Sequence, residues 1–359
     1  MTNKKFNVNQ LASLALLYGS IIIGWIAYYN YQPRLLREFR LNDLIEELFV
    51  AQGVLMFLTP ILAGWLGDKF RKTKGHRLPV ISSGVTLASM VFMTVAFTLL
   101  SGAKDTIATV LPFMIIIWIF SMALFTSPAV SSIELYVPES KLPRATAILT
   151  LVFGLLYAIE PIIIDLIDML TAPGTFAFGG VAVGLSGYLL HKTSKGVYDK
   201  VGNSNPSNHR NDFLTVFVFG VGFGCVLTVI MNLVPERVED LSFLDITGDF
   251  GATIFLGISA VVALPVGYLI TGNNAYKVFL WSFFLGGLSL LMFFEIDYLM
   301  VWAIAGLVSI LSFTAMSVSS LPLVVSKITS SRRVLGVGVF YAGVEFPNGL
   351  LEAYLVIYT

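Results

Sequence analysis

The sequence predicts an all-α polytopic membrane protein with about eleven membrane-spanning helices. Of the 359 residues, 56% are hydrophobic and 12% are charged, and that charged fraction is about half of what a soluble globular domain carries. The apolar residues stand in long continuous blocks instead of alternating with polar ones. Because a helix needs about 20 mostly apolar residues to cross a bilayer, blocks of this length predict spanning helices.

The blocks follow one another along the whole chain. The first lacks a small-residue cleavage site and is too long for a signal peptide, so we expect it to remain as a span. The sixth block is short and rich in glycine, so its composition is the least typical of a spanning helix. In chain order, the eleven predicted spans are Leu11–Tyr31, Leu44–Leu66, Leu78–Leu100, Ile107–Leu135, Ala145–Ile167, Thr175–Leu190, Phe213–Val234, Phe250–Ile270, Tyr276–Phe294, Tyr298–Val325 and Val334–Tyr358.

The basic residues predict the orientation in the membrane. The N-terminus and the loops after the second, fourth, sixth, eighth and tenth spans hold 17 of the 22 lysines and arginines. The loops on the opposite side hold the other 5. Lysine and arginine are enriched in cytoplasmic loops, so we expect a plasma-membrane protein with its N-terminus in the cytoplasm.

One long polar loop, residues 191–212, divides the chain. We interpret it as a cytoplasmic linker between a six-helix bundle at residues 1–190 and a C-terminal bundle at residues 213–359, of which five helices are present. Short matches between the halves predict a duplicated six-helix unit, so a twelfth helix is either naturally absent or truncated. The matched positions are Asn30 with Asn232, Pro33 with Pro235, Gly64 with Gly267, Ser131 with Ser319, Ser132 with Ser320, and Glu160 with Glu345.

The loop between the second and third spans carries the most specific local pattern, GWLGDKFRKTKGHRLP over residues 64–79. Gly64 permits two helices to approach closely. Asp68 is an acid at a helix end among basic groups, and it can also accept from the free N–H groups of a helix N-terminus. Contacts of this kind, made in one conformation and broken in another, form a gate. The alternative is a basic loop that only fixes topology. The other gating candidates here are Lys69, Arg71, Gly75 and Arg77.

This loop resembles the signature loop of the major facilitator superfamily, Gly-x-x-x-Asp-Arg/Lys followed by glycine and basic residues. Its spacing is most similar to that of the glycoside–cation symporters and their sucrose-transporter relatives. A second stretch, ELYVPE at residues 134–139 followed by Arg144, is similar to the loop after the fourth helix in the same superfamily. Glu134 and Arg144 therefore join the gating candidates. The chain departs from the pattern at Lys69 and His76, where arginine is commoner. The resemblance implies a two-bundle fold and a sugar or sugar-like solute.

Two acids interrupt the apolar spans. Glu160 follows Arg144 by sixteen residues and Glu345 follows Arg332 by thirteen, which corresponds to about 24 Å and about 20 Å along ideal helices. A charged acid at such depth is unfavourable unless it is neutral, paired or facing water. Each is therefore a candidate for coupling to a proton or sodium ion, and the alternative is a hydrogen-bonded structural acid beside a proline kink.

Several uncharged polar residues also fall within the spans. We take Tyr28, Asn30, Gln52 and Asn232 as candidates for the wall of a substrate cavity. The alternative for the tyrosine and amide residues near the end of the first span is interface anchoring, which is typical of aromatic residues.

These observations favour a secondary transporter that moves a small solute by alternating access, with symport as one mode. No Gly-x-x-x-x-Gly-Lys-Ser/Thr phosphate loop is present, so ATP is not expected as the energy source. A lipid-modifying membrane enzyme is the first alternative, but His76, His191 and His209 all fall in or beside loops with no metal-ligand spacing. The second is a non-transporting receptor or scaffold on the same fold.

The remaining expectations concern partners. The formal net charge is zero, so we expect no nucleic-acid partner. We expect no cofactor and no metal, contact with membrane lipids, and a monomer. Cys225 is the single cysteine, so the chain has no internal disulfide.

Overall fold

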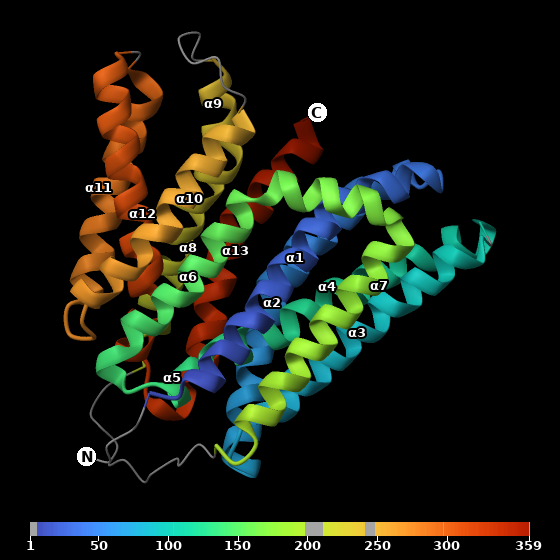
Figure 1. Cartoon of the computed structure of the whole chain (residues 1–359), viewed down its shortest axis with the longest axis horizontal. Coiled ribbons are helices and arrows are strands. Elements are labelled where there is room, and N and C mark those ends of the chain that lie inside the picture. Colours follow the sequence, from blue (N-terminus) through green and yellow to red (C-terminus); the bar gives the residue numbers. More distant parts are fainter. Residues whose placement is uncertain (1–5, 103, 198–210, 241–247, 297, 359) are drawn as a thin grey trace.

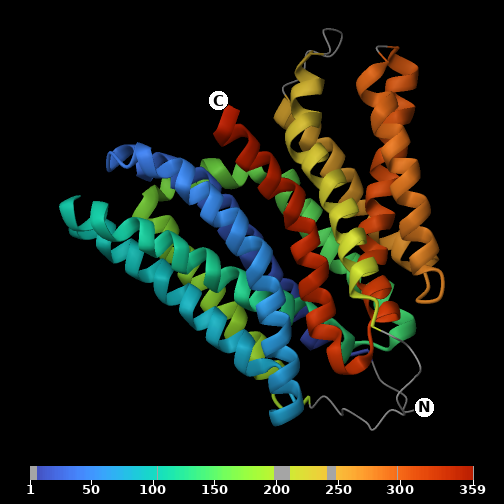
Figure 2. The ribbon, with the colours of Figure 1, turned by 180° about the vertical axis from the view of Figure 1, so that it is seen from behind.

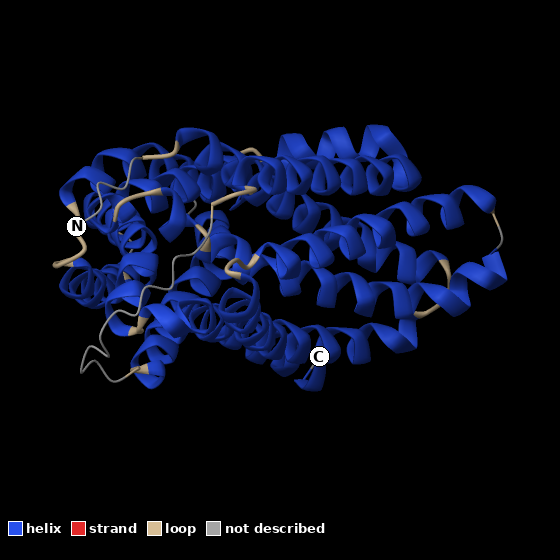
Figure 3. Cartoon of the chain, turned by 90° about the horizontal axis from the view of Figure 1, so that it is seen from below, coloured by secondary structure: helices blue, strands red, loops and turns tan. Residues whose placement is uncertain are grey.

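A computed structural model describes residues 6–102, 104–197, 211–240, 248–296 and 298–358. These residues form helices joined by short turns, and no strand occurs among them (Figure 3). Part of the predicted linker, residues 198–210, lies outside the described residues. Within these described ranges, eleven helices are long and apolar enough to span a membrane, which confirms the predicted fold class and helix number.

The first part of the chain, up to the linker, forms six crossings. Its helices are α1 (Val8–Glu38), α2 (Ile45–Lys74), α3 (Leu78–Ser101), α4 (Lys104–Ser131), the one-turn α5 (Ile133–Tyr136), α6 (Leu142–Ala158) and α7 (Glu160–Ser194). Short 3₁₀ turns at Asn42–Leu44 and Glu139–Lys141 precede α2 and α6.

The second part forms five crossings. Its helices are α8 (Phe213–Thr228), α9 (Val234–Asp240), α10 (Gly248–Leu269), α11 (Ala275–Glu295), α12 (Leu299–Lys327) and α13 (Arg333–Tyr358). A 3₁₀ turn at Ser330–Arg332 precedes α13. Asp212 caps the start of α8 because its carboxylate accepts a hydrogen bond from the backbone N–H of Thr215, 3.2 Å away.

The helices of the first and seventh crossings contain the predicted spans Leu11–Tyr31 and Phe213–Val234 and extend beyond them. α1 continues through Pro33 to Glu38. In the seventh crossing a π-helical turn, Val229–Leu233, joins α8 to α9, which contains Pro235. A proline removes one backbone hydrogen bond from a helix. A π-helical turn just before the proline changes the local hydrogen-bond pattern, and the helix continues past it.

The fifth and sixth crossings also differ from the prediction. The sequence predicts one helix over Ala145–Ile167, but α6 ends at Ala158 and α7 begins at Glu160, with Pro161 in its first turn. Proline is favoured there because the first N–H groups of a helix have no intrahelical acceptor. Within α7 the backbone kinks at Thr171, where φ is 61°. Glu160 therefore lies at a helix start instead of inside a continuous helix.

The first turns of α7 cross over the far end of α1 (Figure 1). The Tyr31 hydroxyl donates a hydrogen bond to the backbone carbonyl of Ile167 at 3.0 Å. Arg34 forms an ion pair with Asp168 at 2.8 Å. These contacts hold the α6–α7 connection against α1, so the segment after Glu160 has a fixed position.

The loops rich in lysine and arginine gather at one end of the molecule, which we call the basic end (Figure 1). The N-terminal segment joins it because the backbone N–H of Asn7 donates to the carbonyl of Tyr136 at 2.8 Å. The far end of the linker also joins it, since the Asn211 side chain accepts hydrogen bonds from the backbone and hydroxyl of Thr329 at 2.9 and 2.7 Å.

The two parts of the chain meet mainly along two helix pairs, α2 with α13 and α6 with α10, and α12 also packs on α6 and α13 on α4. The matched glycines of the two halves lie in these seams. A Cβ atom at Gly64 would stand 2.7 Å from Cα of Leu335, and one at Gly267 would stand 2.6 Å from Cβ of Ala147. Glycine is required for such close approach. From these seams the helices diverge away from the basic end (Figure 2).

Candidate substrate cavity and closed end

A cavity of about 560 Å³ lies between the two parts of the chain. Side chains from α1, α2, α4, α6 and the start of α7 line it from the first part, and side chains from α8, the π-helical turn after it, α12 and α13 line it from the second. A cavity of this size can enclose a small organic molecule. Its wall contains both acids that the sequence singles out, Glu160 and Glu345.

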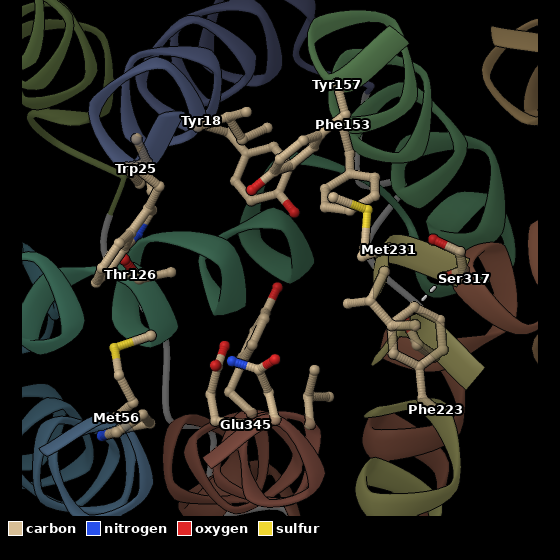
Figure 4. Close-up of a pocket in the computed structure, with 18 of the residues that line it drawn as sticks. Tyr18, Trp25, Met56, Thr126, Phe153, Tyr157, Phe223, Met231, Ser317 and Glu345 are labelled. Carbon is tan, nitrogen blue, oxygen red and sulfur yellow. Dashed lines mark hydrogen bonds between the residues drawn. The ribbon is translucent and has the colours of Figure 1, made fainter. Parts of the chain in front are cut away.

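Glu345 extends from α13 into the cavity, opposite Tyr18 of α1 and Tyr157 of α6 (Figure 4). It interacts electrostatically with both tyrosines and with Tyr341 on its own helix. Tyr18 of α1 and Tyr341 of α13 also face each other in this wall. Glu160 interacts with Tyr157 in the same way. The two acids thus belong to one polar cluster, in which each half of the chain supplies one carboxyl group.

The rest of the wall combines aromatic and aliphatic side chains with serine and threonine hydroxyls and two asparagine amides. Trp25 and Phe153 line it from the first half, and Phe223 lines it from the second (Figure 4). The hydroxyls of Thr150 and Ser317 are hydrogen-bonded across the seam at 2.8 Å. Such a wall combines apolar area with a small number of placed polar groups, as ligand pockets commonly do.

The four predicted cavity residues fall in different places. Asn232 lines the cavity. Tyr28 and Gln52 lie outside its lining and are buried in the first half, where the Tyr28 hydroxyl donates to Gln52 Oε1 at 2.8 Å. Asn30 is also absent from the lining. Tyr29, the next residue after Tyr28, does line the cavity and accepts a hydrogen bond from Gln52 Nε2 at 3.3 Å.

The basic end is closed by contacts between α2 and α13. Both carboxylate oxygens of Asp68 accept hydrogen bonds from the start of α13, from Val334 N at 3.2 Å and from Leu335 N at 2.9 Å. Arg71, one turn further along α2, donates to the carbonyl of Ser330. The first N–H groups of a helix have no intrahelical acceptor and favour an anion, so Asp68 is a well-matched partner for α13.

Glu134 lies at the centre of a buried ionic network next to this contact. Its carboxylate is 2.7 Å from Arg77 Nη2, 3.0 Å from Arg333 Nη1 and 3.9 Å from Arg71 Nη1. Arg333 also pairs with the exposed Glu139 at 3.1 Å. Because Arg333 begins α13 whereas the other partners belong to the first half, the network joins the two halves. Glu134 lies in the short helix α5 and not in a loop as the sequence suggests.

The remaining gating candidates lie around this network. Gly75 ends α2 in the left-handed conformation, with φ of 75°. The Lys69 ammonium group lies over the Trp65 ring at 5.2 Å. Arg144 belongs to the other seam, where its guanidinium lies 4.3 Å from the centre of the Tyr268 ring of α10. The closed end therefore has an ionic side at α2 and α13 and an aromatic side at α6 and α10.

Sequence reasoning missed four residues of these sites. Arg333 was not singled out, although it adjoins a basic loop on the same side as Asp68. Tyr18, Tyr157 and Tyr341 were missed because a tyrosine within an apolar run gives no signal of its own. The available clue was spacing: Tyr341 lies four residues before Glu345, one turn away on the same helix, and Tyr157 lies three residues before Glu160, across the break between α6 and α7.

Solved transporter structures share this fold. The human organic anion transporter MFSD10 is 14% identical, with 98% of this chain and 94% of that chain covered and a TM-score of 0.64. A bacterial homologue of the iron transporter ferroportin, solved in an outward-facing state, is 18% identical with a TM-score of 0.66, and the match covers 97% of this chain and 95% of that one. The E. coli fucose:proton symporter is 11% identical with a TM-score of 0.61, and the match covers 96% of this chain and 90% of that one.

Sequence comparison identifies the family. Among proteins of curated function, no relative matches the chain. The pattern that defines the Major Facilitator Superfamily matches residues 14–346, which is nearly the whole chain. The chain belongs to the Major Facilitator Superfamily of membrane transporters.

Proposed function

We propose that this protein is a secondary active transporter that moves a small solute by alternating access. The observation that carries the proposal is a single cavity, lined by both halves of the chain, whose helices pack closely at the basic end. Opening that end while closing the other would expose the same cavity to the opposite side of the membrane. The halves at residues 1–190 and 213–359 would move as two bundles within one monomer.

The basic end faces the cytoplasm of a plasma-membrane protein in this proposal. Its support is that the N-terminus and the loops predicted to lie on this side hold 17 of the 22 lysines and arginines of the sequence. The conformation described above is then the outward-open one, with the Asp68 contacts acting as the cytoplasmic gate. These contacts form between α2 and α13 and must break when the halves move apart.

Glu345 and Glu160 are the proposed coupling residues, for a proton or a sodium ion. Both line the cavity and both lie among tyrosines at the meeting of the two halves. A carboxyl group that is exposed to one side and then to the other can load an ion in one state and release it in the next. Glu160 also stands at a helix break, and helix interruptions are typical of transporter ion sites.

The substrate class that the loop resemblance favours is a sugar or a sugar-like solute. A fucose:proton symporter and a proton:xylose symporter are among the solved structures of similar fold. Aromatic side chains and hydroxyl groups in the wall are compatible with the faces and edges of such a solute.

Transport in reconstituted vesicles tests the function. Purified protein would be placed in liposomes, and uptake of a solute panel measured with and without an imposed proton or sodium gradient. We expect gradient-driven accumulation of one solute class. The Glu160→Gln/Glu345→Gln double variant should abolish uphill accumulation, and protein-free liposomes give the background. Equal uptake by protein-containing and protein-free vesicles for every solute would contradict the proposal.

Thiol labelling tests the orientation. In a Cys225→Ser background, we expect Lys195→Cys at the basic end to react with an impermeant maleimide only after cells are opened. Ser101→Cys at the opposite end of α3 should react in intact cells. Both positions are exposed and lie outside the cavity, so the pair controls for reactivity. The reverse pattern would overturn the orientation without affecting the transport proposal.

A further inference from the structure

We propose that the cavity binds a monovalent organic cation with an apolar or aromatic body. This inference rests on the proposed transport function for its physiological meaning, and it names the substrate class of that same cavity. It differs from the neutral sugar that the loop resemblance favours, because it follows from the charges and side chains of the cavity wall itself.

The wall carries acidic groups and no basic ones. Glu160 and Glu345 line the cavity, and none of the described residues that line it is a lysine, arginine or histidine. Its other titratable groups are the hydroxyls of Tyr18, Tyr29, Tyr157 and Tyr341. A cavity with low-dielectric walls that holds charge of one sign focuses its field on solutes of the opposite sign. The wall therefore attracts a cation and disfavours an organic anion.

The aromatic side chains suit an organic cation better than a bare metal ion. Trp25, Phe153, Phe223 and Phe340 line the same cavity as the two acids. Aromatic faces attract cations, and they do so most strongly where water is excluded. In contrast, no group of three or more His, Cys, Asp or Glu side chains among the described residues can hold a metal ion. A cation with a large apolar surface uses both the rings and the carboxyl groups.

The size and composition of the cavity support the same class. Its volume of about 560 Å³ is within the range that encloses a drug-sized molecule. Met56 and Met231 add flexible, polarisable contacts that adapt to different apolar shapes. The hydroxyl of Ser317 and the amide of Asn232 line the cavity and can form hydrogen bonds with polar groups at the edge of the solute.

The placement of the acids links binding to both halves of the chain. Glu160 begins α7 in the first half, and Glu345 belongs to α13 in the second. A cation between them is attracted to both halves at once, whereas a neutral solute of the same shape lacks this interaction. The charge of the solute should therefore govern affinity at fixed shape.

Three probes of nearly the same shape test this directly. They are N-methyl-4-phenylpyridinium, which is a cation, 4-phenylpyridine, which is neutral at pH 8, and biphenyl-4-carboxylate, which is an anion. Binding of each to the purified full chain would be measured by equilibrium dialysis at pH 8. We expect the cation to bind at least about tenfold more tightly than the neutral probe, and the anion to bind most weakly.

Variants then show whether the acids are responsible. Glu160→Gln and Glu345→Gln should each weaken binding of the cation by about tenfold and leave the neutral probe unchanged. Glu295→Gln is the matched control, because it removes an exposed acid from α11 outside the cavity. If a glutamine variant does not fold, the order of the three probes on the unmodified protein still decides the question.

The outcomes separate this inference from the transport proposal. If the neutral probe or the anion binds as tightly as the cation, or if no probe binds while vesicles accumulate a neutral sugar, the cation inference is wrong and the transporter stands. If the cation binds through the acids but does not cross vesicle membranes in any imposed gradient, the cation site stands and the transport function fails.

Discussion

The carboxylate of Asp68 accepts a hydrogen bond from the backbone N–H of Leu335 at 2.9 Å, and so a side chain of α2 is bound directly to the start of α13. Its second oxygen accepts from Val334. Two otherwise unsatisfied N–H groups of α13 therefore depend on one acid in the other half of the chain. In the proposed alternating-access cycle this contact breaks when the basic end opens, so its removal is a test of the gate.

We expect Asp68→Asn to slow transport and leave the fold near normal. The amide keeps the size of the carboxylate but loses the charge that favours the helix N-terminus, so it weakens the closed state by about 1–3 kcal/mol. The measurement is the initial uptake rate in vesicles, with Asp212→Asn as a control outside the gate. A wild-type rate for Asp68→Asn would remove Asp68 from the gating mechanism.

Glu134→Gln should be more damaging to stability than Asp68→Asn. Glu134 faces Arg77 and Arg71, whose side chains are only 1% and 4% exposed, and loss of one partner from a buried ion pair costs about 3–5 kcal/mol. Arg333→Gln should be milder because Arg333 is 22% exposed. Thermal unfolding in detergent would rank the three variants. Equal melting temperatures for Glu134→Gln and Arg333→Gln would contradict a central role for Glu134.

Glu345→Gln should abolish uphill uptake and leave solute exchange partly intact. The amide resembles a permanently protonated acid, so a proton cannot load and unload during the cycle. Uphill uptake and counterflow exchange would be compared on the same vesicles. If Glu345 has only a structural role, uphill uptake and exchange will survive together or fail together in this variant. Uphill uptake that survives unchanged would shift attention to Glu160.

Gly338→Ala should prevent complete closure of the basic end. A Cβ atom there would stand 2.1 Å from the backbone carbonyl oxygen of Pro60, which cannot move aside as a flexible side chain can. Gly257→Ala is the matched control, since its nearest contact across the other seam is Ala158 Cβ at 3.6 Å. We expect increased labelling of a cysteine at Ser127, which lines the cavity, from the basic side in Gly338→Ala alone. Unchanged labelling would show that α2 and α13 can separate locally.

Gln32→Met should raise the thermal stability of the protein. Gln32 is 3% exposed, and neither its amide nitrogen nor its oxygen has a hydrogen-bond partner among the described residues. A buried polar group without a partner is unfavourable by about 1–3 kcal/mol. Gln52→Met should have the opposite effect, because Gln52 is bonded to Tyr28. A lower melting temperature for Gln32→Met would indicate that an internal water satisfies its amide.

The fold could be predicted because membrane spans are determined by length and hydropathy, which are local properties. Length and hydropathy predict all eleven crossings, but they do not predict where several of the helices begin and end. The first and seventh helices continue past Tyr31 and Val234, where the predicted spans end, because an apolar block indicates the span and not the last residue of its helix. The break after Ala158 was missed because an apolar run does not reveal where a helix changes direction.

The site was predictable only where a residue is chemically unusual in its setting. An acid in an apolar span identified Glu160 and Glu345, and both line the cavity. Tyr28 and Gln52 are polar residues of the same kind, yet they satisfy each other behind the wall. Which face of a helix meets the cavity depends on the packing of all its neighbours, and the sequence of one helix does not contain that information.

The burial of Glu134 has a consequence for how the cell can influence this protein. Mobile ions weaken interactions between charges that they can approach, over a distance of about 8 Å at physiological ionic strength. Glu134 and Arg77 are 7% and 1% exposed, and Arg71 is 4% exposed, so dissolved salt has little access to them. The closed end should hold equally well in dilute and concentrated salt, and a change in ionic strength at that face would not by itself open it.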